Sequence, residues 1–120
     1  MAIPLDVHKF WFGCKNFEDS ASFRDIWFQA DHSFDEQIRE KFTVTLSEAV
    51  SGALDFWQKN PEGALALVLV LDQFSRNIFR GQPRAFSSDA KARSVARRAI
   101  DQGLDRKVPP IHRIFFYLPF

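Results

Sequence analysis

The chain has 120 residues, enough for one domain with a buried core, and its apolar fraction of 46% and charged fraction of 26% exclude a disordered protein. Its net charge of +1 hides an asymmetry, −4 over residues 1–60 and +5 over residues 61–120, but basic residues alternate with acidic ones and alanines, which argues against nucleic-acid binding. The single cysteine excludes an internal disulfide, and the longest apolar run, Ala64 to Leu71, is too short for a membrane span.

Apolar spacing and capping residues predict helices throughout the first half of the chain. A short helix is expected over residues 6–13, and a second over residues 20–30, where apolar residues recur every three or four positions. A long third helix begins at Asp31 or Ser33, whose side chains are suited to capping, and covers residues 33–50.

The second half is also predicted to be helical. Asn60 followed by Pro61 is a strong helix start, and this helix is expected to run to about Arg80. A further helix covers residues 88–103, and a final segment begins at Pro110. Alanine and leucine outnumber β-branched residues in the apolar run, and no second strand candidate exists to pair with it. The prediction is an all-α, single-domain protein.

A cluster of charged residues follows the apolar run directly. Asp72, Arg76 and Arg80 are four residues apart, so one α-helix would place all three on the same face, beside residues that must be buried. The remaining candidate ligand-binding residues in this segment are Asn77, Arg84 and Asp89.

Two interpretations of this cluster stay open. In the first, Asp72 pairs with Arg76 and the later arginines tie a loop to a neighbouring helix, which makes the cluster a structural network. In the second, Arg76, Arg80 and Arg84 bind the carboxylate or phosphate of a ligand, because guanidinium groups bind such groups through two hydrogen bonds.

No metal or cofactor site is predicted. His8, His32 and His112 lie in three separate segments, and the glycines are scattered rather than gathered in a phosphate-binding loop. Cys14 has no base near it in sequence and is interpreted as a thiol without a catalytic role. The N-terminus lacks the basic and apolar regions of a secretory signal, so a soluble cytoplasmic protein is expected.

The last ten residues are unusually apolar. Residues 111–120 include Phe115, Phe116, Tyr117 and Phe120, too many rings for a free tail. We therefore expect this segment to expose apolar surface and to permit self-association.

Three stretches of the sequence resemble the DUF924 family, bacterial proteins of unknown function. The first runs from Trp27 to Phe42, and the last contains Arg113 and residues 116–119. The long middle stretch contains Trp57, Pro61, residues 65–67 and 71–81, residues 84–86 and Asp89.

The resemblance implies a TPR-like array of antiparallel helix pairs, in which neighbouring pairs complete one another's cores. The expected pairs are residues 33–50 with 61–80, and residues 88–103 with the segment from Pro110. The family pattern continues into further helices with a His-Ser-Glu motif, so residues 1–120 are expected to form a single domain that lacks the family's C-terminal helices.

The leading functional hypothesis is a binding or interaction module that takes a peptide or a small anionic ligand through Arg76, Arg80 and Arg84. The alternative is an enzyme acting on a small anionic substrate, with Asp72 or Asp89 as acid or base and the arginines as electrostatic stabilisers. A third hypothesis is that the chain is a non-functional fragment of a longer family member. Neither a nucleic acid nor a membrane is expected as a partner.

Overall fold

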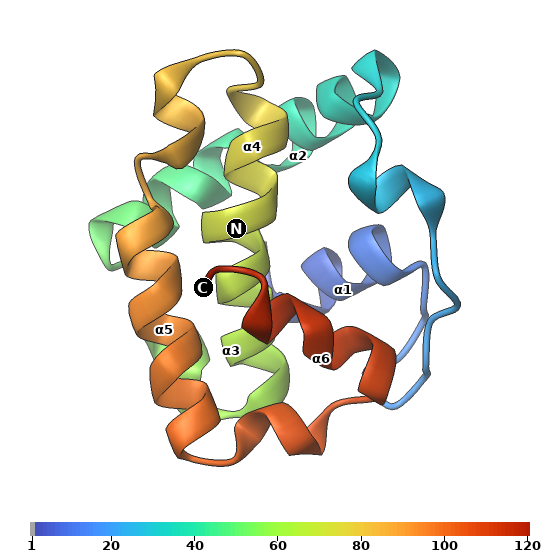
Figure 1. Ribbon diagram of the computed structural model, residues 1–120, viewed down its shortest axis with the longest axis vertical. Coiled ribbons are helices and arrows are strands. Elements are labelled where there is room, and N and C mark those ends of the chain that lie inside the picture. The colour runs from blue at the N-terminus through green and yellow to red at the C-terminus, as the bar shows by residue number, and fades with distance from the viewer. Residues whose placement is uncertain (1) are drawn as a thin grey trace.

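The computed structural model describes residues 2–120, and all regular structure in this range is helical (Figure 1). The α-helices are α1 (Pro4–Phe12), α2 (His32–Ser51), α3 (Pro61–Leu69), α4 (Ser75–Ile78), α5 (Asp89–Asp101) and α6 (Pro110–Tyr117). Short turns join them: η1 (Asp25–Phe28), η2 (Asp55–Lys59), η3 (Val70–Phe74), η4 (Pro83–Phe86) and η5 (Leu104–Lys107). The absence of strands among residues 2–120 confirms the all-α prediction. Within the same residues, no helix combines the length and the apolar character needed to cross a bilayer.

One helical rod, α3–η3–α4, forms the centre of the molecule. Every residue from Gly63 to Leu71 is buried, as expected for a helix that is apolar around its whole circumference. Helices α1, α2, α5 and α6 contact the rod, and Figure 1 shows α5 running alongside it while α6 crosses near its middle. The core therefore surrounds one helix instead of lying between two layers.

The start of α3 depends on a capping residue and a glycine. The Asn60 side chain accepts a hydrogen bond of 2.7 Å from the Gly63 backbone N–H, which confirms the predicted cap. A Cβ atom at Gly63 would lie 2.0 Å from the Trp57 carbonyl oxygen. Turn η2 can approach the rod this closely only because residue 63 has no side chain.

The helix predicted over residues 20–30 is wrong; only the short turn η1 forms there. Tertiary hydrogen bonds hold this segment against α1 and α6 instead. Arg24 Nη1 donates to the carbonyls of Phe10 and Trp11 at 3.1 and 2.7 Å. The Ala21 backbone N–H donates to His112 Nε2 at 2.9 Å. These tertiary bonds form in place of the backbone hydrogen bonds of the helix that the apolar spacing predicts.

The expected helix pairs are in contact. Helix α2 packs against α4, and α5 packs against α6. The TPR-like stacking of such pairs stays a prediction, because the described helices share one central rod.

The C-terminal segment is divided between core and surface. Phe115 and Phe116 are buried, so only part of the segment 111–120 can expose the apolar surface that the sequence predicts. Tyr117, Leu118 and Phe120 remain 43%, 44% and 54% exposed. The period of helix α6 accounts for this division, since its buried residues lie on the side that faces the rod.

Two buried histidines join α1 to α6. His8 Nε2 donates to the Glu62 carbonyl at 2.9 Å, whereas His112 Nε2 accepts from Ala21. Their rings are 6.5 Å apart, and Phe12 stacks on His112 at 3.7 Å between centroids. Burial lowers the pKa of each imidazole to about 4, and the nearby His8 further lowers that of His112.

The exposed C-terminal rings predict dye binding or self-association. The 120-residue chain should bind a hydrophobic dye or sediment partly as a dimer, because Leu118 and Phe120 leave large apolar side chains exposed close together in the sequence. The double substitution Leu118→Ser and Phe120→Ser should reduce both signals. Val44→Ser, at a position 72% exposed on α2, is the control. A monomeric, dye-silent protein would contradict this expectation.

The buried histidines predict loss of stability in mild acid. Their pKa of about 4 in the folded state lies below the unfolded value of about 6.5, so the unfolded state binds more protons as the pH falls. The free energy of unfolding should therefore decrease between about pH 6.5 and 4, by up to about 3 kcal/mol for each histidine. Urea denaturation at several pH values in this range measures the free energy of unfolding. His112→Gln should reduce the dependence of this free energy on pH, whereas His32→Gln, at an exposed position, should not. An unchanged pH dependence in the His112 variant would show that the buried histidine does not cause the loss of stability.

Candidate functional site

The charged cluster begins inside a π-helical turn. The rod is α-helical up to Leu69, passes through the π turn η3 and resumes as α4 at Ser75. A π turn contains one residue more than an α turn and displaces the residues that follow it. The Leu71 carbonyl in this turn accepts a hydrogen bond of 2.6 Å from Ser88 Oγ at the start of α5.

Asp72 lies in the π turn and forms the centre of a first network. Its side chain is 3% exposed and pairs with Arg76, with 2.8 Å between Oδ1 and Nη1. Gln73 Nε2 donates to the other carboxylate oxygen at 2.8 Å. Arg76 also pairs with Asp89, at 3.2 Å from Nη1 to Oδ1. The predicted ion pair between Asp72 and Arg76 is therefore confirmed, and both oxygens of Asp72 are occupied.

The pKa of Asp72 is shifted upward. Burial raises it, and the charge of Asp89 adds to the effect, whereas Arg76 and the hydrogen bond from Gln73 act in the opposite direction. Partners within the chain thus compensate only part of the cost of burying this carboxylate.

Arg80 belongs to a second network and does not join Asp72. Helix α4 ends at Ile78, so Arg80 lies beyond its end, contrary to the expectation of one helical face for Asp72, Arg76 and Arg80. It binds Asp35 of α2 through two hydrogen bonds, at 2.6 Å from Nε and 3.1 Å from Nη2. Asn77 Nδ2 donates to Asp35 Oδ1 at 2.9 Å. This network ties the end of the rod to α2.

Asp35 is held ionised by these partners. Burial alone would raise the pKa of its carboxyl, but hydrogen bonds from Arg80 and Asn77, together with the charges of Arg80 and Arg39, lower it below its usual range. Arg39 also donates to the Ile78 carbonyl at the end of α4. The ion pair between Asp35 and Arg80 is consequently a structural link between helices.

Arg84 lies apart from both networks. It belongs to turn η4, and its guanidinium carbon is 4.2 Å from the centroid of the Phe79 ring. No carboxylate among residues 2–120 forms an ion pair with it. The six candidate residues are therefore divided between two paired networks and one separate arginine.

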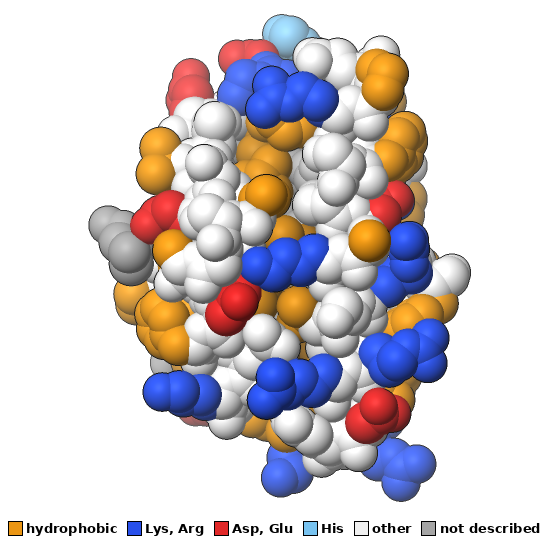
Figure 2. Space-filling view, turned by 90° about the vertical axis from the view of Figure 1, so that its left-hand side faces the viewer, with side chains coloured by type: hydrophobic (Ala, Val, Ile, Leu, Met, Phe, Trp, Pro, Cys, Tyr) orange, Lys and Arg blue, Asp and Glu red, His pale blue; other side chains and the backbone are white. Residues whose placement is uncertain are grey.

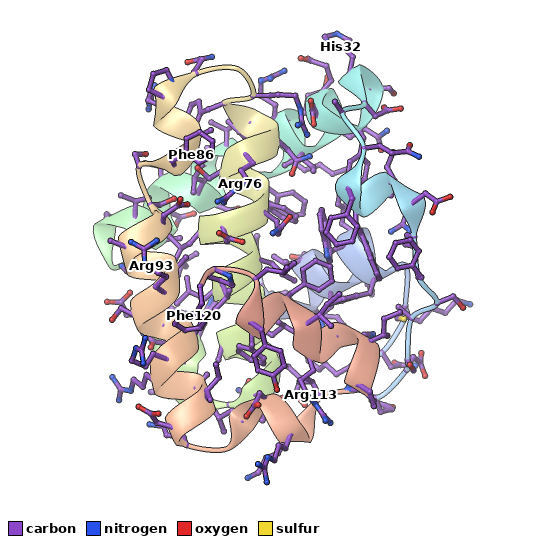
Figure 3. All side chains as sticks on the ribbon, viewed as in Figure 1. His32, Arg76, Phe86, Arg93, Arg113 and Phe120 are labelled. Atoms are coloured by element: carbon purple, nitrogen blue, oxygen red, sulfur yellow. The ribbon has the colours of Figure 1, made fainter. Side chains whose placement is uncertain are left out.

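A groove passes on both sides of Arg76 and Arg80, which line two adjoining hollows of about 290 and 780 Å³. We call these two hollows the arginine groove. Large apolar side chains border it: Phe28 on one side, Phe86 on the other, and Leu118 from the C-terminal segment. Figure 3 shows Arg76 beside Phe86, whose ring centroid is 5.2 Å from the guanidinium carbon.

Several residues of the site could not be found by sequence reasoning. Asp35 does not stand out in the sequence as a site residue, although it is 5% exposed and bonds to two candidate residues. Its partners follow it by more than forty positions, and no local signal reports such a contact. Phe28 and Leu118 are far apart in the sequence, and nothing in their spacing places them in the same groove.

The chain offers little support for a metal or thiol centre. Among residues 2–120, no three His, Cys, Asp or Glu side chains are grouped closely enough to hold a metal ion. Burial and the charge of Asp19 raise the pKa of the Cys14 thiol, although Arg24 opposes them, so the nucleophilic thiolate is disfavoured.

Comparison with known proteins identifies a family but no activity. The sequence profile of a family described as "Bacterial protein of unknown function (DUF924)" matches residues 7–120. The solved structure of ATU0120, a protein of unknown function from Agrobacterium tumefaciens, is 37% identical and superimposes with a TM-score of 0.86. The match covers 97% of this chain and 61% of that one. No curated protein matches the sequence significantly.

The Asp72 network predicts a loss of stability on substitution. Asp72→Ala should lower the free energy of unfolding by about 1–2 kcal/mol, because it removes the hydrogen bonds that Arg76 and Gln73 donate to the carboxylate, whereas Arg76 keeps its pair with Asp89. Chemical denaturation measures the change. Asp101→Ala, at an exposed position of α5, should change it by no more than about 0.5 kcal/mol. Equal melting temperatures for the Asp72 variant and the unmodified protein would show that the network contributes nothing.

Proposed function

The chain belongs to the DUF924 family, whose description names no function, and we propose that it is an interaction module that binds a polypeptide segment in the arginine groove. The observation that carries the proposal is the combination of exposed apolar anchors with a polar floor whose charges are already paired. A peptide presents the matching surface, since its side chains are apolar anchors and its backbone is polar but uncharged.

The anchors are large side chains left exposed at the rim. Phe28 and Phe86 are 54% and 58% exposed, and Leu118 is 44% exposed. Aromatic side chains at a concave surface supply much of the binding energy in protein interfaces, because each buries a large apolar area with few rotatable bonds. Three such anchors along one groove suit the spaced apolar side chains of a helix or an extended peptide.

The polar lining favours a peptide backbone over a free anion. Arg76 faces two carboxylates and Arg80 faces one, so the charge of the groove is cancelled from within. Each guanidinium nevertheless has N–H groups beyond those used in its own pairs, and the amides of Gln29 and Gln73 supply both donors and acceptors. Peptide carbonyls and N–H groups match this lining, and a phosphate would have to compete with Asp35, Asp72 and Asp89.

A second candidate function, an enzyme acting on a small anionic substrate, is favoured by Asp72 alone. Its pKa is raised by burial and it lines the groove, as a catalytic acid often does. Against this role, both of its oxygens already accept hydrogen bonds, from Arg76 and Gln73. The binding role therefore has the stronger support.

A peptide selection followed by mapping tests the proposal. Short peptides selected from a displayed library against the 120-residue chain should share spaced apolar residues, and their binding should shift the backbone amide resonances of η1, α4 and η4. Phe28→Asp should weaken their binding by at least about tenfold, since it places a charge where an apolar anchor is needed.

Phe56→Asp is the matched control. Phe56 is also 54% exposed but lies in η2, away from the groove, so this substitution should leave peptide affinity unchanged. The proposal fails if the selected peptides bind elsewhere, or if both aspartate variants bind them as the unmodified protein does.

A further inference from the structure

A second pocket, separate from the arginine groove, lies between α2 and the segment that joins η4 to α5. It has a volume of about 470 Å³, and its floor is formed by Leu46, Val50 and Phe79. Figure 2 shows, on the face formed by α2 and α5, hydrophobic side chains in a hollow between two ridges, with basic side chains at its ends. No residue that lines this pocket also lines the groove.

Arg84 is the cation of this pocket, and its charge is uncompensated. Stacking on Phe79 holds its guanidinium plane over the apolar floor. The lining includes neither Asp nor Glu. Lys91, on neighbouring α5, is engaged elsewhere, because its Nζ lies 2.9 Å from Asp55 Oδ1 and donates to the Ala49 carbonyl. The pocket thus offers one ordered guanidinium to an anion.

The hydroxyl groups of the lining add a second feature. Ser75, Ser87 and Ser88 donate their protons to backbone carbonyls at 2.9, 2.8 and 2.6 Å. Each oxygen can therefore only accept a further hydrogen bond. Thr43, Ser47 and Ser51 also line the pocket, and a ligand that brings a donor to the oxygens of Ser75, Ser87 and Ser88 and an anion to Arg84 would match both features.

We propose that this pocket binds a small hydroxylated aromatic carboxylate. The carboxylate pairs with Arg84, the ring packs on Phe79, Leu46 and Val50, and the hydroxyl donates to the serine oxygens. The volume lies within the range of small-molecule sites. An ammonium group is a poorer donor here, because no lining carboxylate balances its charge. The inference is independent of the peptide groove.

Binding of para-hydroxyphenylacetate to the 120-residue chain tests the proposal. The expected result is saturable binding in calorimetry, with amide shifts confined to residues 43–51, 75–79 and 84–88. Its uncharged amide and para-hydroxyphenethylamine should bind at least about tenfold more weakly, and phenylacetate, which lacks the hydroxyl, should also bind more weakly.

Matched variants locate the site. Arg84→Gln keeps a polar side chain at an exposed position and removes the charge, so it should weaken binding by about tenfold or more. Val50→Glu, at a position 53% exposed, should have the same effect because it adds a carboxylate to the lining. Arg93→Gln, at an exposed position of α5, and Phe28→Asp, in the groove, should leave the affinity for para-hydroxyphenylacetate unchanged.

Three results would overturn the proposal. The first is no saturable binding of the acid up to about 10 mM, and the second is equal affinity for the acid and its amide. The third is unaltered affinity for the acid in Arg84→Gln and Val50→Glu variants that keep the helical circular dichroism spectrum. Phe28 does not line this pocket and Arg84 does not line the groove, so failure here is distinguishable from failure of the peptide-binding proposal.

Discussion

A helix that is buried on every side imposes one constraint on the whole molecule. From Gly63 to Leu71 the rod has no exposed residue, so the surrounding helices must cover it completely and any polar group along it needs a partner within the protein. The apolar part meets this constraint by packing against α1, α2, α5 and α6. The first polar residue, Asp72, meets it through Arg76 and Gln73.

The same constraint organises the charges around the rod. Three carboxylates, Asp35, Asp72 and Asp89, are arranged around two guanidinium groups, those of Arg76 and Arg80. These pairs leave little net charge in the arginine groove. Arg84, which extends from turn η4 over Phe79, pairs with none of these carboxylates, so its charge is not compensated. The arginines of one segment of the sequence are therefore divided between a surface with paired charges and a pocket with an unpaired one.

The sequence contains the information for much of the fold and for only part of the site. The caps at Asp31 and Asn60, and the apolar run that follows the second, are local signals and correctly predict the start of α2 and of α3. The pair between Asp72 and Arg76 is also local, since it joins residues one turn apart. By contrast, residues 20–30 are shaped by bonds to α1 and α6, which no periodicity in that segment reveals.

The contact between Arg80 and Asp35 has no signal in the sequence, for a related reason. It depends on where α4 ends and on how α2 crosses the rod, and both are properties of packing. The hydroxyl groups of the Arg84 pocket come from three elements and meet only after folding. Serine residues are common in loops, so their presence in the sequence does not indicate a binding site.

The π turn determines the direction in which the side chains of α4 point. A π turn accommodates one additional residue within a single turn, so removing one residue between Val70 and Phe74 could convert η3 into an α turn and leave α4 in nearly the same orientation. An α-helix turns by about 100° for each residue, so an insertion here, or the removal of a second residue, would rotate α4 and turn Arg76 away from Asp89, although no charged residue had been altered. Among relatives of this chain, insertions and deletions of any length should accordingly be tolerated in the segment between α1 and η1, whereas these five positions should tolerate at most the loss of one residue.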